Sequence, residues 1–256
     1  MKILAVLRMV PDPATELQVD GETMAIDREW LDFQLNDFDD HALEEAILLK
    51  EAVGGRVIAA CIGEGATRTL QMAGAKGADE LIVLESPGEG PISSRDIAHA
   101  VAELAKSRSV DLVVTGVQTS EDIFGQLGPY LGGLLQWPHL SGTSHVAADS
   151  PNLAVTQERG GGVAATWCVT LPAVLGIQTA TRAPRYVSGS KLREATRMPI
   201  AKLPVGDSGF GASATMLSLD MMSQEGSAID LGSNPEDVAE SLVRMLAARE
   251  LLSGAA

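Results

Sequence analysis

The chain has 256 residues, of which 45 % are apolar and only 4 % aromatic, so its core must be largely aliphatic. A formal charge of −15 and an isoelectric point near 4.6 argue against binding to the nucleic-acid backbone, which requires a basic surface. The first apolar segment is interrupted by Arg8 and is too short for a secretion signal or a membrane span. These features predict a soluble, cytoplasmic protein without a transmembrane segment.

Near-continuous apolar runs alternate with segments of helical period through the first half of the chain. An Asp20-Gly21 pair inside the alternating stretch 17–26 additionally predicts a hairpin. Parallel sheets covered by helices on both faces have such apolar strands. We therefore expect an α/β fold, a doubly wound and mostly parallel sheet. The predicted strands are 2–7, 56–63, 80–85 and 111–116, and the predicted helices are 36–52, 66–78, 94–107 and 125–136.

The pattern changes after Pro138. Residues 139–178 are rich in strand-forming segments, with a turn at Gly160–Gly162, whereas 182–232 are irregular and contain several prolines and glycines. Helical period returns in Pro235–Leu252, with Pro235 at a position that the first turn of a helix permits. We expect an α/β nucleotide-binding domain over residues 1–181, followed over 182–256 by an arm and a C-terminal helix.

The stretch "GVQTSEDIFGQLG", residues 116–128, is the main candidate site. Gly116 ends a predicted strand, and ligands of open parallel sheets bind beyond such carboxyl ends. Gly125 and Gly128 allow close backbone approach at a helix start, where free amides favour an anion such as phosphate. Side-chain donors are available from Gln126, Thr119 and Ser120.

The same stretch also admits a simpler interpretation. Glu121 and Asp122 would repel a phosphate unless they turn away or accept from a ribose or a base. Glycines and small polar residues also form ordinary loops and caps, and the stretch matches neither common phosphate-binding glycine motif. The loops Arg8–Pro13, Cys61–Gly63 and Asn36–Asp40 are candidates for the same crevice, where Phe38 either stacks on a ligand or packs back on its helix.

No catalytic residue is expected. The four histidines belong to no nucleophile or metal motif. Cys61 and Cys168 lie in apolar runs without metal-ligand spacing, so both are expected to be core residues, and no metal site is expected.

Ordered motifs along the whole chain resemble the beta subunit of electron transfer flavoproteins. The motifs are "MVPDP", "LNDFDDHALEEAILLKE", "KGADELIVL", "DLVVTGVQTS", "QWP", "GGGVAATWCVTLPAVLGIQ" and "APRY" followed by "MPI". The segments "GVQTSED" and "WPH" are most similar to the branch that serves amine-oxidising flavin dehydrogenases.

The resemblance implies a heterodimer with an alpha subunit that carries single electrons from a flavin dehydrogenase to a quinone oxidoreductase or another acceptor. It implies FAD held mainly by the alpha subunit and a structural AMP in this chain. The implied AMP contacts are Val6, Asn36, Asp37, Phe38, Asp39, Cys61, Gly116, Gln118, Thr119, Ser120, Asp122, Gly125, Gln126, Leu127 and Gly128, while Pro13 and Phe38 would lie near FAD.

Several positions depart from the family pattern. Ile123 and Gly125 stand where many family members have an acid or asparagine, and Leu127 replaces a hydroxyl residue or a valine. Pro13 stands where several relatives have an aromatic residue. Electron-bifurcating relatives hold a second FAD in this crevice, and the missing acid at Ile123 makes AMP the preferred ligand. A stand-alone adenine-nucleotide sensor is a further alternative, against which the long arm argues.

The resemblance also places a partner-docking loop after "PRY". Gly189 stands where the family has an anchoring leucine, which leaves Leu192 as a candidate substitute. Basic residues gather here on an otherwise acidic chain, an arrangement that steers acidic partners. The expected docking residues are Arg185, Gly189, Lys191, Leu192 and Arg193.

Overall fold

The structure is a computed structural model that describes residues 1–15, 18–20, 25–26, 31–85, 92–149, 151–205 and 228–252. The chain divides into two units, Met1–Leu217 and Ser218–Ala256, and each unit is considered by itself.

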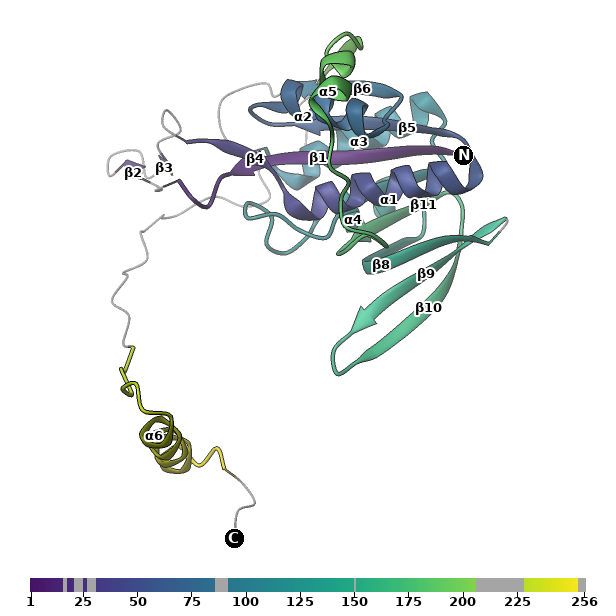
Figure 1. Cartoon of the computed structure of the whole chain (residues 1–256). Coiled ribbons are helices and arrows are strands. Elements are labelled where there is room, and N and C mark those ends of the chain that lie inside the picture. The colour runs from purple at the N-terminus through teal and green to yellow at the C-terminus, as the bar shows by residue number, and fades with distance from the viewer. Residues whose placement is uncertain are drawn as a thin grey trace. The chain divides into compact units, whose positions relative to one another are not determined.

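Ten strands form one sheet in the described part of the first unit (Figure 1). Their order is β10-β9-β8-β11-β7-β1-β5-β6-β12, with β4 paired antiparallel to β1. All neighbours from β8 to β12 in this order are parallel, whereas β9 and β10 are antiparallel additions at one edge. The strands are β1 (Lys2–Pro11), β4 (Phe33–Leu35), β5 (Arg56–Ile62), β6 (Glu80–Glu85), β7 (Leu112–Gly116), β8 (His139–Asp149), β9 (Asn152–Arg159), β10 (Val163–Thr170), β11 (Ala173–Ile177) and β12 (Ile200–Pro204).

Helices cover both faces of the sheet. Alternate side chains of β1 point to opposite faces, so Ile3 and Leu7 join one buried cluster while Leu4 and Val6 join another. The first cluster contains α1 (Asp37–Val53), visible beside β1 in Figure 1, and α2 (Ala66–Lys76). The second contains α3 (Ser94–Arg108) and α4 (Leu127–Leu135). The predicted doubly wound sheet is thereby confirmed.

Strand order reverses at β1, which has β5 on one side and β7 on the other. The ladder between β1 and β5 extends to the pair Arg8–Ile62, but the ladder between β1 and β7 ends at Ala5–Val114. The two central strands therefore separate towards their carboxyl ends. This is the place where open α/β sheets bind ligands.

The predicted hairpin over residues 17–26 is confirmed in part. Strands β2 (Val19–Asp20) and β3 (Ala25–Ile26) pair antiparallel, while the residues that connect them lie outside the described part of the chain.

The prediction that both cysteines are core residues is wrong for one of them. Cys61 is buried, but Cys168 is exposed. Cys168 lies on the edge strand β10, most of whose side chains are exposed because no helix of this chain packs on them within the described residues.

The tract expected to be irregular from residue 182 contains two ordered elements. Helix α5 (Gly189–Ala195) packs on α2, and β12 extends the sheet beside β6. This tract starts from a firm attachment to α1, where the carboxylate of Glu45 accepts hydrogen bonds from the amides of Val146 and Thr181 and from the Thr181 hydroxyl. The functional boundary expected after residue 181 stays a prediction.

The second unit contains α6 (Pro235–Ala248), which begins where helical period predicts a helix. The Asn234 side chain accepts a hydrogen bond from the Glu236 amide, and Pro235 lies in the first turn. Leu242, Val243 and Leu246 are exposed. Among the described helices of the chain, none is both long and apolar enough to cross a membrane.

Replacing Glu45 by Ala should strongly destabilise the fold. The carboxylate is 1 % exposed, and its loss leaves two amides and a hydroxyl without their acceptor. We expect the free energy of unfolding to fall by roughly 2–4 kcal/mol in urea denaturation. Glu103→Ala is the control, because the Glu103 side chain is 75 % exposed in its pair with Lys106. A control loss as large as that of Glu45→Ala would contradict the assignment.

Candidate functional site

A buried ion pair between Arg8 and Asp39 closes the split between β1 and β7. The Arg8 guanidinium donates from Nε to Oδ2 and from Nη2 to Oδ1 of Asp39, each at 3.0 Å. The side chains are 5 % and 0 % exposed, respectively. Desolvation of both charges is costly, so the pair is tolerable only because its geometry is bidentate and further hydrogen bonds complete it.

Those further hydrogen bonds gather three elements around the pair. Asp39, in the first turn of α1, also accepts from the amide of Arg8 at 3.0 Å and from the amide of Gly116 at 2.6 Å. Arg8 Nη2 donates to the carbonyl of Gly116 at 3.2 Å, and Asn36 Nδ2 donates to the carbonyl of Gln118 at 2.9 Å. The ends of β1 and β7 and the start of α1 are thus joined through side chains.

Gly116 is required by this arrangement. A Cβ at this position would lie 2.5 Å from Asp39 Oδ1 and 2.6 Å from the Phe38 Cβ. Gly116 therefore lets α1 approach the end of β7 closely enough for the hydrogen bond between its amide and Asp39.

Asp122 caps the helix that follows the loop. The amides of Gln126 and Leu127, where α4 begins, donate to its carboxylate, the Gln126 amide at 2.9 Å and the Leu127 amide at 3.3 Å. Ser94 Oγ donates to the same carboxylate at 2.8 Å, and Arg8 Nη1 lies 3.6 Å from its Oδ2. The helix start expected to face a phosphate therefore has its amides bonded to an acidic side chain of the chain itself.

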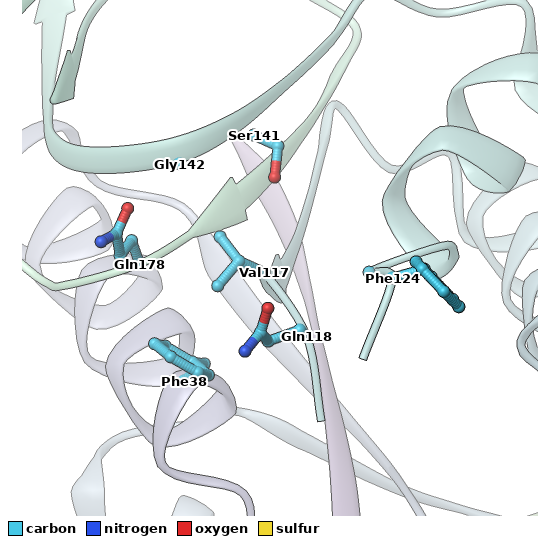
Figure 2. A pocket seen from close by; sticks show the side chains of 8 residues that line it. Phe38, Val117, Gln118, Phe124, Ser141, Gly142 and Gln178 are labelled. Atoms are coloured by element: carbon cyan, nitrogen blue, oxygen red, sulfur yellow. The ribbon is translucent and has the colours of Figure 1, made fainter. Parts of the chain in front are cut away.

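A pocket of about 370 Å³ lies next to the ion pair, on the side of β7 that faces β11 and β8. Figure 2 shows Phe38 and Gln178 on one side of it, Phe124 on the other, and Gln118 between them. The lining combines an aromatic ring with side-chain amides and a hydroxyl, groups that can stack on a planar ligand and bond its polar edge. The lining residues are Phe38, Val117, Gln118, Phe124, Gly125, Ser141, Gly142 and Gln178.

The structure brings many of the predicted nucleotide residues together at this edge. Phe38, Gln118 and Gly125 line the pocket. The others in contact with the ion pair or the cap are Asn36, Asp39, Gly116, Thr119, Asp122, Gln126 and Leu127.

Other predicted residues lie apart from these contacts. Val6 is inside β1, fully buried, and Cys61 is buried near the end of β5. Burial, with Asp39 nearby, strongly raises the pKa of the Cys61 thiol, which is therefore a packing group and not a nucleophile. Asp37, Ser120 and Pro13 are exposed. Gly128, in the first turn of α4, faces the ring of His139 at the start of β8.

Sequence reasoning placed the loop that starts at Arg8 near the crevice, but it missed the ion pair of Arg8 with Asp39 and part of the pocket lining. Arg8 interrupts an apolar strand, and this charged residue within a buried run was the available signal of a buried ion pair. Ser141, Gly142 and Gln178 come from β8 and the end of β11, so only the order of the strands reveals that they face Gln118.

The residues expected to dock a partner fall into two kinds. Lys191, Arg193 and Gly189 are exposed on α5, and Leu192 is half-buried. Arg185 is instead held within the chain, because its Nε donates to Glu44 at 2.9 Å and its Nη1 to Glu51 at 2.6 Å. These hydrogen bonds raise the pKa of Arg185, and the same bond from Arg185 lowers the pKa of Glu51. Arg185 thus fastens the start of the arm to α1.

Among the described residues, no three His, Cys, Asp or Glu side chains are grouped so as to hold an ion.

The fold and the split between its central strands define a doubly wound α/β protein with a crevice at the carboxyl edge of the sheet, where proteins of this class bind ligands. Residues 23–208 match the model of the electron transfer flavoprotein domain. The chain belongs to the electron transfer flavoprotein family, in which its relatives are beta subunits.

Three of these relatives carry the name electron transfer flavoprotein subunit beta. The protein of Bradyrhizobium diazoefficiens is 28 % identical over 249 residues, which cover 96 % of this chain and 97 % of that protein. The protein of Methylophilus methylotrophus is 30 % identical and covers 83 % of this chain and 82 % of its own length. The human protein is 31 % identical and covers 82 % of this chain and 83 % of its own length.

Replacing Gly116 by Ala should destabilise the fold strongly, although it adds only one methyl group. The new methyl group would press on Asp39 and Phe38, so the hydrogen bond between the Gly116 amide and Asp39 is lost. We expect a loss of roughly 3 kcal/mol in the free energy of unfolding, measured in urea. Gly133→Ala is the matched control, because its Cβ meets nothing within 4 Å among the described residues. That control should gain about 0.5–1 kcal/mol from helix propensity, and equal losses in both variants would contradict the prediction.

His139 should make stability fall at acidic pH. Its Nε2 is buried beside Gly128 and has no hydrogen-bond partner in the described part of the chain, and burial lowers its pKa. The unfolded chain therefore binds the proton more readily, so the contribution of neutral His139 is lost as pH falls below about 6.5. His139→Gln should lose less free energy of unfolding than the native chain between about pH 7.5 and 5.5. Equal losses would show that His139 does not contribute.

Proposed function

We propose that this chain is the beta subunit of a heterodimeric electron transfer flavoprotein. Together with an alpha subunit it would share one FAD and pass single electrons from a flavin dehydrogenase, of the amine-oxidising kind, to a quinone oxidoreductase or another acceptor. The observation that carries the proposal is the similarity to beta subunits over 96 % of the chain. The role is that of an electron carrier, and the predicted cytoplasmic location belongs to the same proposal.

The crevice would hold a structural AMP. A pocket of about 370 Å³ lies in the lower part of the range for small-molecule sites. Phe38 offers a stacking face for a base, and Gln118, Gln178 and Ser141 offer polar groups to its edge. Arg8 Nη1 is a buried donor without a hydrogen-bond partner among the described residues, a sign that the neighbourhood suits an additional polar group. These residues fit an adenine nucleotide.

The redox chemistry would come from FAD, which supplies one-electron transfer when it is bound between the subunits. This chain would contribute position and shielding. Phe38 is held in place by the first turn of α1, whose Asp39 is locked to Arg8, so its ring can cover one side of a flavin without moving. Pro13 is exposed beyond β1 and would approach the flavin from the chain's surface.

The dehydrogenase would dock on α5. Lys191 and Arg193 present positive charge there on a chain of net charge −15, which favours an acidic partner surface and fast association. Arg185 would not contact the dehydrogenase itself. Its hydrogen bonds to Glu44 and Glu51 would instead hold in place the segment that leads into α5. Leu192 is the candidate anchor in place of the leucine missing at Gly189.

Nucleotide content tests the proposal directly. This chain is co-expressed with its alpha partner, the purified complex is denatured, and the released nucleotides are identified by chromatography and mass. We expect about one FAD and one AMP per heterodimer, since one flavin is shared and one crevice is available.

A different nucleotide content of the purified complex would support one of the two alternative functions. Two FAD molecules would assign the crevice to the electron-bifurcating class. AMP or ATP alone, with no partner retained, would favour the nucleotide sensor and overturn the electron-transfer proposal. Gly133→Ala, which alters neither the crevice nor the ion pair, should keep the nucleotide content of the native complex.

A further inference from the structure

Tyr186 presents an aromatic ring to solvent in the segment that leads from β11 into α5. The residue is 95 % exposed, more than any other large apolar or aromatic side chain in the described part of the chain. A single exposed ring is common on protein surfaces, so its surroundings decide whether it marks a contact. Here the backbone that carries the ring is fixed, and positive charge follows it along the chain.

Arg185 fixes the backbone immediately before this ring. Its amide donates to Glu44 Oε2 at 3.0 Å and its Nε to Glu44 Oε1 at 2.9 Å. Its Nη1 and Nη2 donate to the two carboxylate oxygens of Glu51 at 2.6 and 3.1 Å. Glu44 is only 2 % exposed. The amide and the guanidinium of Arg185 are therefore both bound to α1, and a bidentate pair of this kind favours one geometry.

The preceding residues of the segment are attached to the same helix. His41 Nδ1 accepts from the Ala180 amide at 3.1 Å, and Glu45 Oε2 accepts from the Thr181 amide at 2.7 Å. His41 and Glu45 are four residues apart, so they lie on one side of α1. Figure 1 shows the segment crossing α1 on its way to α5. Tyr186 therefore follows a stretch of backbone that is fastened to a buried helix.

A ring on fixed backbone loses little conformational freedom when a partner covers it. Tyrosine has only two side-chain torsions to restrict, and it is among the residues that contribute most to the binding energy of protein interfaces. The other large side chain here, Leu192, is half-buried on α5 and offers less surface. Tyr186 thus combines exposure with a fixed position, as an interface anchor requires.

Positive charge accompanies the ring along residues 182–197. Four basic side chains of this stretch are exposed, and Glu194 is its only acid. The four are Arg182, Lys191, Arg193 and Arg197. On a chain of net charge −15 this excess is local. It suits a partner with an acidic surface, because complementary charges speed association and align the two proteins.

We propose that Tyr186 is a contact residue for the flavin dehydrogenase and that Arg185 is the positioning residue that holds it in place. The ring enters an apolar pocket within an acidic surface of the dehydrogenase. The inference rests on the proposed function, because it assumes that a dehydrogenase delivers electrons to the heterodimer. Since Phe38 lies in the first turn of α1, one helix sets both the cofactor side of the chain and the docked ring.

The test measures how fast an amine-oxidising flavin dehydrogenase, supplied with its amine, reduces the FAD of the purified heterodimer at varied heterodimer concentration. Tyr186→Ala should raise the KM for the heterodimer about tenfold and change kcat by less than about twofold, because the ring serves docking and not the chemical step. Tyr186→Phe keeps the ring and should stay within about threefold of the native KM. Urea unfolding should be unchanged in both variants, since the side chain is exposed.

Arg185 is tested through its coupling to Tyr186. Arg185→Lys keeps the charge but loses the fork that bonds Glu44 and Glu51 together, so the KM should rise about fivefold. Added to Tyr186→Ala, the same change should raise the KM by less than about twofold, since a fixed segment matters only while it carries the ring. A general structural role of Arg185 would instead raise the KM by the same factor with and without the ring.

Val53→Ala is the matched control. Val53 is the last residue of α1 and is 48 % exposed, so this variant also truncates an exposed apolar side chain on the helix that holds the segment. Its KM and kcat should equal those of the native complex.

Three results would overturn the inference. An unchanged KM in Tyr186→Ala, with normal reduction of the native complex, would remove this contact and leave the proposed function standing. Loss of the alpha subunit from Tyr186→Ala, seen in size-exclusion chromatography, would place the ring in the heterodimer interface instead. Failure of the dehydrogenase to reduce the native complex, while dithionite still reduces its FAD, would overturn the proposed function together with the inference.

Discussion

The structure of the functional edge depends on one buried charge pair. Arg8 lies within the buried run of β1, and without a partner its charge would be intolerable in the split between the central strands. Asp39 supplies that partner from α1, and both of its oxygens are also used by backbone amides, those of Arg8 and Gly116. Removing either side chain would leave the other charged and buried, which typically costs about 3–5 kcal/mol. The pair therefore sets the position of α1. Arg8 Nη2 and Asn36 Nδ2 also donate to the carbonyl of Gln118, in the loop that lines the pocket.

In the loop after β7, glycine and acid have the positions that the sequence predicts, but their partners are groups of the chain itself. Its glycines do allow close approach, but at Gly116 the neighbour is α1 of the same chain. Its acid does sit at the helix start, but as a cap for α4. The pocket lies beside the end of β7 and is also lined by residues of β8 and the end of β11. The candidate site therefore combines a helix start capped by an acidic side chain with a pocket whose polar groups come partly from neighbouring strands.

Much of the fold could be predicted because its signals are local. The apolar run Glu80–Glu85 coincides with β6, and helical period with Asn36 before it locates α1. The pairing of Arg8 with Asp39, the pocket contribution of Gln178 and the exposure of Cys168 depend instead on strand order and on which edge of the sheet lacks a covering layer. No periodicity encodes these facts. The ordered elements after residue 182 could not be predicted either, because β12 is recognisable as a strand only from its pairing with β6.

Strand β10 has a consequence for how such a chain must be produced. It ends the order of the described sheet, and Val163 and Trp167 are 58 % and 43 % exposed along it. An edge with unpaired amides and apolar side chains is a template on which another chain can add a strand. A chain produced with this edge uncovered is therefore at risk of self-association, and production conditions must guard against it.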